Sequence, residues 1–357
     1  MTNIEINLTE NRKPIPATDE LGFGVHFSDH MLVMDYNLDQ GWHGARIEPY
    51  GPIQIDPSMM ALHYGQAIFE GMKAFRASDG NINLFRARDH FNRFNNSARR
   101  VCIPEPDVEE LLAGLKKLLE VDQQWVPSEH GTALYIRPFI FATDQFLGVR
   151  PSHTYKLMII LSPVGAYYAE GFNPVKIMVE DKYVRAVRGG IGAIKTPGNY
   201  AASLLAAVKA QEKGFTQVLW LDAHELKWLE EVGTMNIMVK IGDEVITPPL
   251  NGSILPGITR DSTIKILRNW NIPLMEKQIS IDEVMQAGSD GTLEEMFGTG
   301  TAAIISPVGS IHYKGSSVII NSGNVGELSQ KLFDEITAIQ YGSKDDAYNW
   351  IDTIEVV

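Results

Sequence analysis

Residues 162–174 read Ser-Pro-Val-Gly-Ala-Tyr-Tyr-Ala-Glu-Gly-Phe-Asn-Pro. Pro163 and Pro174, together with Gly165 and Gly171, interrupt any helix or strand, and such a run is typical of a loop. Because a chain of 357 residues suits about two domains of ordinary size, we interpret this stretch as the connection between them. The sequence therefore predicts a first domain over residues 1–163, an interdomain linker over 164–174 and a second domain over 175–357.

The part of the sequence before this linker mixes strands with helices. Strand-like runs flank an Asp-Gly pair at 79–80 within residues 69–86, and Asp-Gly favours the tight turn of a hairpin. A strand over 133–143 sends Tyr135 and Arg137 to the same face, because side chains alternate along a strand. The expected helices are a short one around Phe91, Phe94 and Ala98, and an amphipathic one that begins at Asp107 and ends near Val121.

The part beyond the linker also mixes strands with helices. The expected elements are a helix over 200–213 with Asn199 as its cap and Gly214 as its stop, strands over 216–221 and 234–240, a helix that starts near Ile258, and a closing helix over 328–339. The order of these elements lacks a regular βαβ alternation. An α+β fold is therefore favoured over a doubly wound parallel sheet.

The composition excludes several classes of function. A hydrophobic content of 44% with 21% charged residues is that of a globular protein. A net charge of -13 repels phosphate backbones and anionic lipid, so small molecules are expected as partners rather than nucleic acid or a membrane. The single cysteine, Cys102, excludes an intrachain disulfide. Because the polar N-terminus has no apolar signal segment and no apolar run reaches about 18 residues, we expect a soluble, cytoplasmic protein.

Three familiar motifs come close to a match, and each fails at a position that its chemistry needs. Residues 189–196 end like a phosphate-binding P-loop, but Ile194 stands where that loop has glycine before the lysine. Residues 298–303 fit a loose dinucleotide fingerprint, yet β-branched residues and then proline follow where a helix is needed. His26 and His30 have the spacing of a metal pair, but no second cluster completes four ligands, so we expect no metal site. A dinucleotide-dependent oxidoreductase remains the alternative from a different class.

Lys195 stands in an unusual setting for a lysine. Most lysines are solvated surface charges, and a single lysine carries little information by itself. Here glycines precede it at 189, 190 and 192, the sequence Pro197-Gly198 follows it, and carboxylates on its N-terminal side are distant. An amine on such a loop loses its proton more easily than most, as formation of a Schiff base requires. The residues themselves leave both a surface role and a catalytic role open.

Six motifs, taken together, resemble those of branched-chain amino-acid aminotransferases. The match keeps the order and approximate spacing of that family from about Leu21 to Tyr341. The motifs are residues 69–76 (Phe-Glu-Gly-Met-Lys-Ala-Phe-Arg), 135–138 (Tyr-Ile-Arg-Pro), 195–200 (Lys-Thr-Pro-Gly-Asn-Tyr), 231–236 (Glu-Val-Gly-Thr-Met-Asn), 255–260 (Leu-Pro-Gly-Ile-Thr-Arg) and 297–302 (Phe-Gly-Thr-Gly-Thr-Ala). The resemblance implies the class IV fold of pyridoxal-phosphate (PLP) enzymes, with a small N-terminal α/β domain, a linker and a larger C-terminal pseudo-barrel domain.

The resemblance also implies a role for each residue of a PLP site. Lys195 matches the lysine that holds PLP as a Schiff base and then moves the substrate proton. Glu231 matches the carboxylate that keeps the pyridine nitrogen protonated, and Tyr200 matches the phenol that bonds the ring oxygen. The residues that match the phosphate site are Arg93, Ile258, Thr259 and Thr301. Without the resemblance, a solvated acid, a core tyrosine and an exposed helix arginine are the ordinary interpretations.

The substrate pocket that the resemblance implies serves two kinds of side chain. Tyr135 and Arg137 match residues that meet the side-chain carboxylate of glutamate, and their shared strand face permits this. Thr234 resembles part of the site for the substrate α-carboxylate, together with the backbone of Ala302 and Ala303. The residues that match the pocket wall are Phe23, Tyr64 and Phe69, with Val149 entering from a partner subunit. Phe23 and Phe69 fit a place in the core equally well.

The activity implied is the reversible transfer of the amino group of L-leucine, L-isoleucine or L-valine to 2-oxoglutarate, in a homodimer. The nearest alternatives are a D-amino-acid aminotransferase and an aminodeoxychorismate lyase, and the motifs at 135–138 and 231–236 favour the branched-chain activity. Some family members carry a Cys-x-x-Cys pair where this chain has Ala303 and Ser306, so no thiol switch is expected. The segment 222–230 is longer and more charged than in some relatives, which leaves its conformation open.

Overall fold

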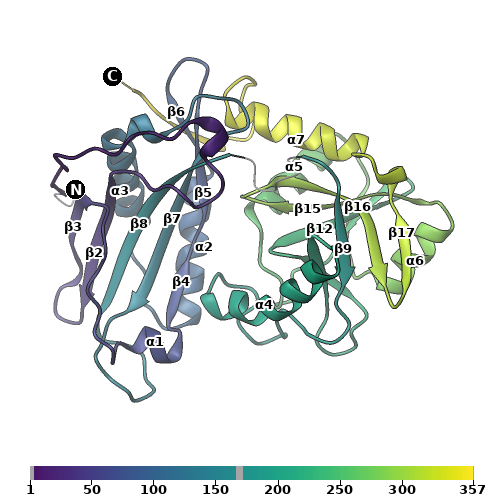
Figure 1. Ribbon diagram of the computed structural model, residues 1–357, viewed down its shortest axis with the longest axis horizontal. Coiled ribbons are helices and arrows are strands. Elements are labelled where there is room, and N and C mark those ends of the chain that lie inside the picture. The colour runs from purple at the N-terminus through teal and green to yellow at the C-terminus, as the bar shows by residue number, and fades with distance from the viewer. Residues whose placement is uncertain (1–3, 166–171, 357) are drawn as a thin grey trace. The chain divides into compact units, whose positions relative to one another are not determined.

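The computed structural model describes residues 4–165 and 172–356, which form two compact units (Figure 1). The first unit contains residues 4–165, 195–197 and 338–356, and the second contains 172–194 and 198–337. Of the linker expected over 164–174, residues 166–171 lie outside the described residues.

The division differs from the sequence expectation at the C-terminal end of the chain. The expected second domain ran to residue 357, whereas the structure assigns the described residues from Ala338 onward to the first unit. The reason is that β18 (Ile351–Ile354) pairs antiparallel with β6 (Ile82–Phe85). Residues 195–197 also belong to the first unit, which places Lys195 there.

A sheet of nine strands is the frame of the first unit. Its other strands are β1 (Glu5–Ile6), β2 (His30–Asn37), β3 (Gly41–Pro49), β4 (Ala67–Phe69), β5 (Met72–Arg76), β7 (Ala133–Ala142) and β8 (Tyr155–Val164). The strand order is β1-β3-β2-β8-β7-β5-β6-β18, and β4 pairs with β7 outside this path. Neighbouring strands run antiparallel except β1 and β3.

Two helices cover one face of this sheet and build the core of the first unit (Figure 1). Leu134 and Ile136 of β7 pack in one cluster with Phe91 and Phe94, all of them fully buried. Tyr135 and Arg137 point to the opposite face, as the alternation of the strand predicted. The helices are η1 (Thr18–Glu20), α1 (Met60–Tyr64), α2 (Ala87–Arg100), α3 (Val108–Val121) and η2 (Gln123–Trp125), of which α2 and α3 contribute to this core.

Local rules that were readable in the sequence hold in this unit. Strands β5 and β6 form the predicted hairpin, and Gly80 in its turn has a φ of +88°, which glycine adopts without strain. The Asp107 side chain accepts a hydrogen bond from the backbone N–H of Glu110 (2.9 Å) and caps α3, as predicted.

The second unit contains a closed ring of strands. Its strands are β9 (Val175–Val179), β10 (Gln217–Leu221), β11 (Leu229–Val232), β12 (Met235–Ile241), β13 (Glu244–Thr247), β14 (Leu274–Glu276), β15 (Leu293–Gly300), β16 (Ile304–Tyr313) and β17 (Ser316–Ile319). The order is β11-β10-β9-β16-β15-β12-β13-β14, and β17 pairs with β16. Because β11 also pairs with β12, six strands close on themselves. The expected α+β fold with a pseudo-barrel domain is therefore confirmed.

Four helices accompany this barrel: α4 (Pro197–Glu212), α5 (Ile258–Asn269), α6 (Ile281–Ser289) and α7 (Glu327–Gln340), with η3 (Asn321–Gly323) before α7. The sequence predicted Asn199 as the N-terminal cap of α4, and this prediction was wrong. The helix starts at Pro197, where a missing N–H costs nothing, and Asn199 instead donates to the carbonyls of Ile191 (2.8 Å) and Ile194 (2.9 Å). Gly257 precedes α5, so that helix begins where the sequence predicted.

Three further features of the described residues concern the segment 298–303, the metal-ligating side chains and the length of the helices. Strand β16 follows the residues 298–303, so the helix that a dinucleotide fingerprint needs is absent there. Within residues 4–165 and 172–356, no group of three or more metal-ligating side chains is arranged to hold a metal ion. Among these described residues, no helix has both the length and the apolar character to cross a membrane.

Candidate active site

Lys195 is held by its backbone to two elements of the first unit. Its carbonyl accepts from the N–H of Phe69 (3.1 Å), and its N–H donates to the Ser97 hydroxyl (3.1 Å). The next residue, Thr196, donates its hydroxyl to the carbonyl of Ala67 (2.8 Å). The Lys195 Nζ lies 5.1 Å from the centroid of the Phe69 ring. The end of β4 and the helix α2 therefore fix the lysine backbone, while its amine lies over an apolar ring.

Four of the predicted substrate residues meet on the face of the sheet that carries Tyr135. The Phe23 and Tyr135 rings pack edge to face with centroids 5.0 Å apart. Arg137 donates from Nη2 to the Tyr135 hydroxyl (3.0 Å), and its guanidinium lies 4.8 Å from the centroid of the Phe69 ring. The Nε of Arg137 is buried and, among the described residues, has no hydrogen-bond partner. This group therefore combines apolar rings with the Arg137 guanidinium, whose Nε is a donor without a partner among the described residues.

Gly71 leaves room for the Tyr135 ring. In the register of β5 and β7, Tyr135 stands opposite Lys73. A Cβ on Gly71 would lie only 1.9 Å from the Tyr135 hydroxyl, so the ring leans across the glycine. Any side chain at position 71 would therefore force the Tyr135 phenol to move.

Tyr64 and Val149 lie on a different group of elements. Tyr64 ends α1, and its hydroxyl bonds to the carbonyl of Leu147 in the loop that joins β7 to β8. Val149 lies in the same loop and is 84% exposed. Neighbouring Phe146 and Leu147 are also exposed, so this loop presents an apolar surface.

Arg93 projects from α2 and is buried in a charged cluster. Its Nε and Nη2 donate to the Glu70 carboxylate (2.9 and 2.6 Å), and the His90 ring lies 3.3 Å from the same carboxylate. Burial alone would raise the pKa of Glu70, but the Arg93 guanidinium and the His90 ring outweigh it and hold that pKa well below its usual range. Glu70 therefore orients Arg93. The sequence interpretation assigned no role to Glu70, because nothing in its motif shows that it faces Arg93.

Glu231 occupies the end of β11 in the second unit and is surrounded by donors. One carboxylate oxygen accepts from the Asn236 amide (3.2 Å) and from the backbone N–H of Leu255 (3.1 Å). The other oxygen pairs with Nε of Arg185 (2.5 Å). An ionised carboxylate only accepts hydrogen bonds, so it fits these three donors. Neither Asn236 nor Arg185 had a role in the sequence interpretation.

The start of α5 offers backbone donors near the same group. A Cβ on Gly257 would lie 1.9 Å from the Asn236 amide oxygen, so only glycine fits before Ile258 and Thr259. The first N–H groups of a helix have no partner within the helix and favour an anion. Asn236 also pairs in register with Thr299 on β15, whose hydroxyl is buried and, in the described residues, lacks a hydrogen-bond partner.

The remaining predicted residues of the second unit lie at strand and helix ends. Thr301, Ala302 and Ala303 form the turn between β15 and β16, and Tyr200 lies half-buried in the first turn of α4. Thr234 is exposed in the turn between β11 and β12. The predicted cofactor residues thus divide between the units, with Arg93 and Lys195 in the first and the others in the second.

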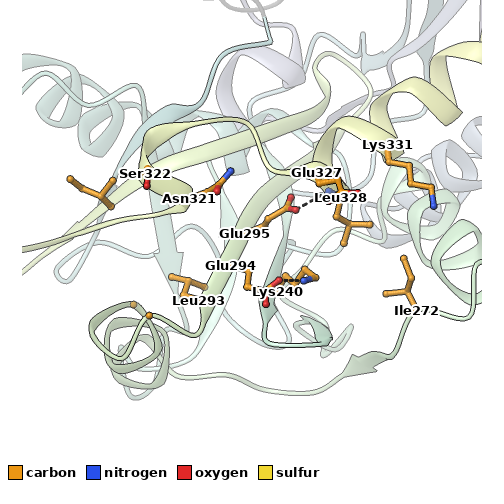
Figure 2. Close-up of a pocket in the computed structure, with 13 residues that line it drawn as sticks. Lys240, Ile272, Leu293, Glu294, Glu295, Asn321, Ser322, Glu327, Leu328 and Lys331 are labelled. Carbon is orange, nitrogen blue, oxygen red and sulfur yellow. Dashed lines mark hydrogen bonds and ion pairs between the residues drawn. The ribbon is translucent and has the colours of Figure 1, made fainter.

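A further surface pocket lies in the second unit beside α7 (Figure 2). Its buried carboxylate, Glu295, accepts from the N–H groups of Leu328 (2.8 Å) and Ser329 (2.9 Å), and so caps the helix. Lys240 pairs with Glu294 on its rim. These polar groups stabilise the fold around the pocket, and none of the predicted site residues lines it.

Comparisons with known proteins show which family this chain resembles. The family model of amino-transferase class IV matches residues 67–311. The chain is 55% identical over 347 residues to the branched-chain-amino-acid aminotransferase 2 of Bacillus subtilis, a match that covers 97% of this chain and 96% of that protein.

Solved structures show the same likeness. The branched-chain amino acid aminotransferase of Escherichia coli superposes with a TM-score of 0.77 at 26% identity, covering 92% of this chain and 99% of that one. The branched-chain aminotransferase of the thermophilic archaeon Thermoproteus uzoniensis, solved with norvaline, gives a TM-score of 0.75 at 26% identity, covering 91% and 100%. A third branched-chain amino acid aminotransferase, solved with pyridoxamine 5'-phosphate, gives a TM-score of 0.76 at 25% identity, covering 91% and 98%.

Proposed function

This chain belongs to the amino-transferase class IV family, and on that premise we propose that it is a PLP-dependent branched-chain-amino-acid aminotransferase. It transfers the amino group of L-leucine, L-isoleucine or L-valine to 2-oxoglutarate and gives the branched 2-oxo acid and L-glutamate. Amino acids and 2-oxo acids are its small-molecule partners. The observation that carries the proposal is the meeting of the Lys195 amine, the Phe69 ring and the Tyr135–Arg137 pair within one unit.

The residues fit the cofactor by the chemistry of their donors. Bound PLP supplies an electron sink for the bond electrons at the substrate Cα. Glu231, fixed by three donors, is the acceptor for the proton on the ring nitrogen, and Tyr200 is the donor to the ring oxygen. The groups that would bind the phosphate dianion are the guanidinium of Arg93, the first N–H groups of α5 at Ile258 and Thr259, and the Thr301 hydroxyl.

Lys195 has two roles in this proposal. Its amine would hold the cofactor, and its Nζ would take the proton from the substrate Cα. The backbone bonds of Lys195 to Phe69 and Ser97 do not involve the amine, so the side chain moves while its anchor stays.

Substrate selection follows from the group around Tyr135. Phe23 and Phe69 offer apolar rings to an aliphatic side chain. Arg137 offers its Nε, which has no hydrogen-bond partner among the described residues, to the side-chain carboxylate of glutamate or 2-oxoglutarate. Thr234 and the backbone at Ala302 and Ala303 receive the α-carboxylate. The residues around Tyr135 therefore accept a dicarboxylate substrate in one half reaction and an aliphatic substrate in the other.

The test of this function is the visible absorption of the purified protein with added substrates. L-Leucine, L-isoleucine, L-valine and L-glutamate should each shift the band of the lysine-bound cofactor, and 2-oxoglutarate should reverse the shift. D-Leucine, the control, should leave the band in place. A band that shifts only with D-amino acids would identify a D-amino-acid aminotransferase instead, and protein without such a band would exclude PLP chemistry.

We also propose that the enzyme acts as a homodimer in the cytoplasm, with Val149 reaching the partner's substrate pocket. Val149 is 84% exposed within the chain and stands beside exposed Phe146 and Leu147, which favours burial against another surface. A Val149→Asp variant should keep the thermal stability of the isolated chain, because exposed sites change stability by only about 0.5 kcal/mol. Its leucine turnover should fall about tenfold.

The control for this prediction is Leu38→Asp, which changes an exposed residue in the turn between β2 and β3. It should sediment as the wild type does and keep its activity. Sedimentation at assay concentrations should show no active monomer. A wild-type protein that sediments as a fully active monomer would contradict the proposal.

A further inference from the structure

A buried arginine outside the assigned site contacts the carboxylate on which the cofactor assignment depends. Arg185 follows β9 and is 9% exposed. Its Nε pairs with Glu231 (2.5 Å), its Nη1 donates to the carbonyl of Ser253 (2.9 Å), and its Nη2 donates to the carbonyl of Gly192 (3.1 Å). One guanidinium therefore joins a strand end and two loops.

Each of the three contacts of Arg185 leads to a different part of the proposed site. Glu231 is the proposed partner of the cofactor ring nitrogen. Ser253 lies in the loop before α5, whose first turn is assigned to the phosphate, and Gly192 lies in the loop that leads to Lys195. The planar fork of arginine reaches several acceptors at fixed angles, which the single ammonium of lysine does not.

The two loops come unusually close at this point. A Cβ on Gly192 would lie 2.1 Å from the Ser253 carbonyl oxygen and 2.5 Å from the Ala186 Cβ, so only glycine permits the approach. The approach leaves two carbonyl oxygens and one carboxylate near each other, and these groups repel. The Arg185 guanidinium offsets that repulsion, since it is a cation that donates to all three.

Glu231 depends on Arg185 for orientation and for charge balance. Asn236 and Leu255 hold one carboxylate oxygen, and Arg185 holds the other. Removing one partner of a buried ion pair leaves an uncompensated charge, which is strongly unfavourable away from water. Without Arg185, the Glu231 carboxylate either turns toward water or binds the proton of the cofactor ring nitrogen more strongly or more weakly.

We propose that Arg185 is a positioning residue of the cofactor site: it fixes the Glu231 carboxylate and the loops before Lys195 and α5 in one arrangement. The inference rests on the proposed function, because it assigns Glu231 to the cofactor ring nitrogen. Arg185 itself acts only through Glu231 and the two loops.

The experiment compares Arg185→Met, Arg185→Lys, Glu231→Gln and the Arg185→Met/Glu231→Gln double variant. The matched control is Arg86→Met, which removes another buried arginine, paired with Asp89 in the first unit. Three quantities are measured: the PLP dissociation constant by titration of the apoprotein, the pH midpoint of the visible band, and kcat and KM for leucine.

Arg185→Met should weaken PLP binding about tenfold and lower kcat about thirtyfold, with the KM for leucine changed less than about threefold. The pH midpoint of the band should move by at least about half a unit, because the charge balance at Glu231 changes. Arg185→Lys should recover part of kcat. The double variant should match Glu231→Gln within about threefold, because coupled residues are not additive.

Outcomes that overturn the inference are distinct from those that overturn the function. If Glu231→Gln behaves as wild type in band and turnover, the cofactor assignment of Glu231 fails. If Glu231→Gln is impaired but Arg185→Met has the same PLP affinity and kcat as Arg86→Met, only the role of Arg185 is refuted. The same holds if the losses of kcat in the two single variants multiply in the double variant. If Arg185→Met does not accumulate as folded protein, Arg185→Lys serves as the test. An Arg185→Lys variant with the wild-type kcat and the wild-type pH midpoint of the visible band would refute the proposal.

Discussion

Lys195→Ala should abolish amino transfer while the protein stays folded. The alanine keeps the backbone carbonyl that accepts from Phe69 and the N–H that donates to Ser97, so the local anchor survives. What is lost is the amine that both holds the cofactor and moves the substrate proton. Because the variant loses both the covalent anchor of the cofactor and the base for the proton transfer, kcat should fall by at least about 10⁴-fold. Turnover is measured with leucine and 2-oxoglutarate, and folding by circular dichroism.

The identity of the lysine is checked by borohydride reduction of the holoenzyme and mapping of the labelled peptide. Lys73 is the competitor that the structure offers, since it is 8% exposed and burial lowers its pKa to about 8. An amine with such a pKa also reacts readily with an aldehyde. The label should appear on Lys195 in the wild type and vanish in Lys195→Ala. A label on Lys73, or turnover that survives in Lys195→Ala, would contradict the assignment.

Features set by neighbours in sequence could be predicted from the sequence alone. The hairpin of β5 and β6 and the Asp107 cap depend on residues only a few positions apart, and both occur as expected. The face of Tyr135 and Arg137 followed from the alternation of one strand. Asn199 was misassigned because its cap pattern competes with Pro197, which already suits a first helical turn.

Features set by distant pairing could not be read from the residues. The four residues of β18 carry no signal that their partner is β6, more than 260 positions earlier, and so the end of the chain was assigned to the other domain. Closure of the barrel likewise depends on β11 pairing with both β10 and β12. Only the family resemblance anticipated that closure.

In the candidate site, too, contacts between residues far apart in the sequence could not be predicted. Lys195, Glu231 and Arg137 were assigned to the site because motifs of a known family contain them. Glu70 and Arg185 were missed, although each holds a predicted residue in place, since their contacts cross 23 and 46 positions of sequence respectively. Residues that position others are defined by the fold: the motif at 69–76 contains Glu70, but it does not show that this carboxylate faces Arg93.

Arg137→Ala should separate the two half reactions, because only one of them uses a side-chain carboxylate. Arg137 stacks on Phe69, bonds the Tyr135 hydroxyl and keeps a buried Nε without a partner among the described residues. Loss of a buried charge pair costs about 2–5 kcal/mol, so kcat/KM for glutamate should fall about 100-fold. For leucine, whose side chain pairs with no charge, the loss should stay below about fivefold.

Two further variants distinguish charge from packing in this prediction. Arg137→Met keeps most of the volume beside Phe69, so it should restore leucine reactivity to nearly the wild-type value and leave glutamate impaired. Tyr135→Phe removes only the hydroxyl that accepts from Arg137, so its effect on glutamate should be smaller than that of Arg137→Ala. Single-turnover spectra of the cofactor band with each amino acid give both rates. If Arg137→Ala and Arg137→Met slow leucine and glutamate equally, Arg137 supports the pocket by packing alone and the dicarboxylate is recognised elsewhere.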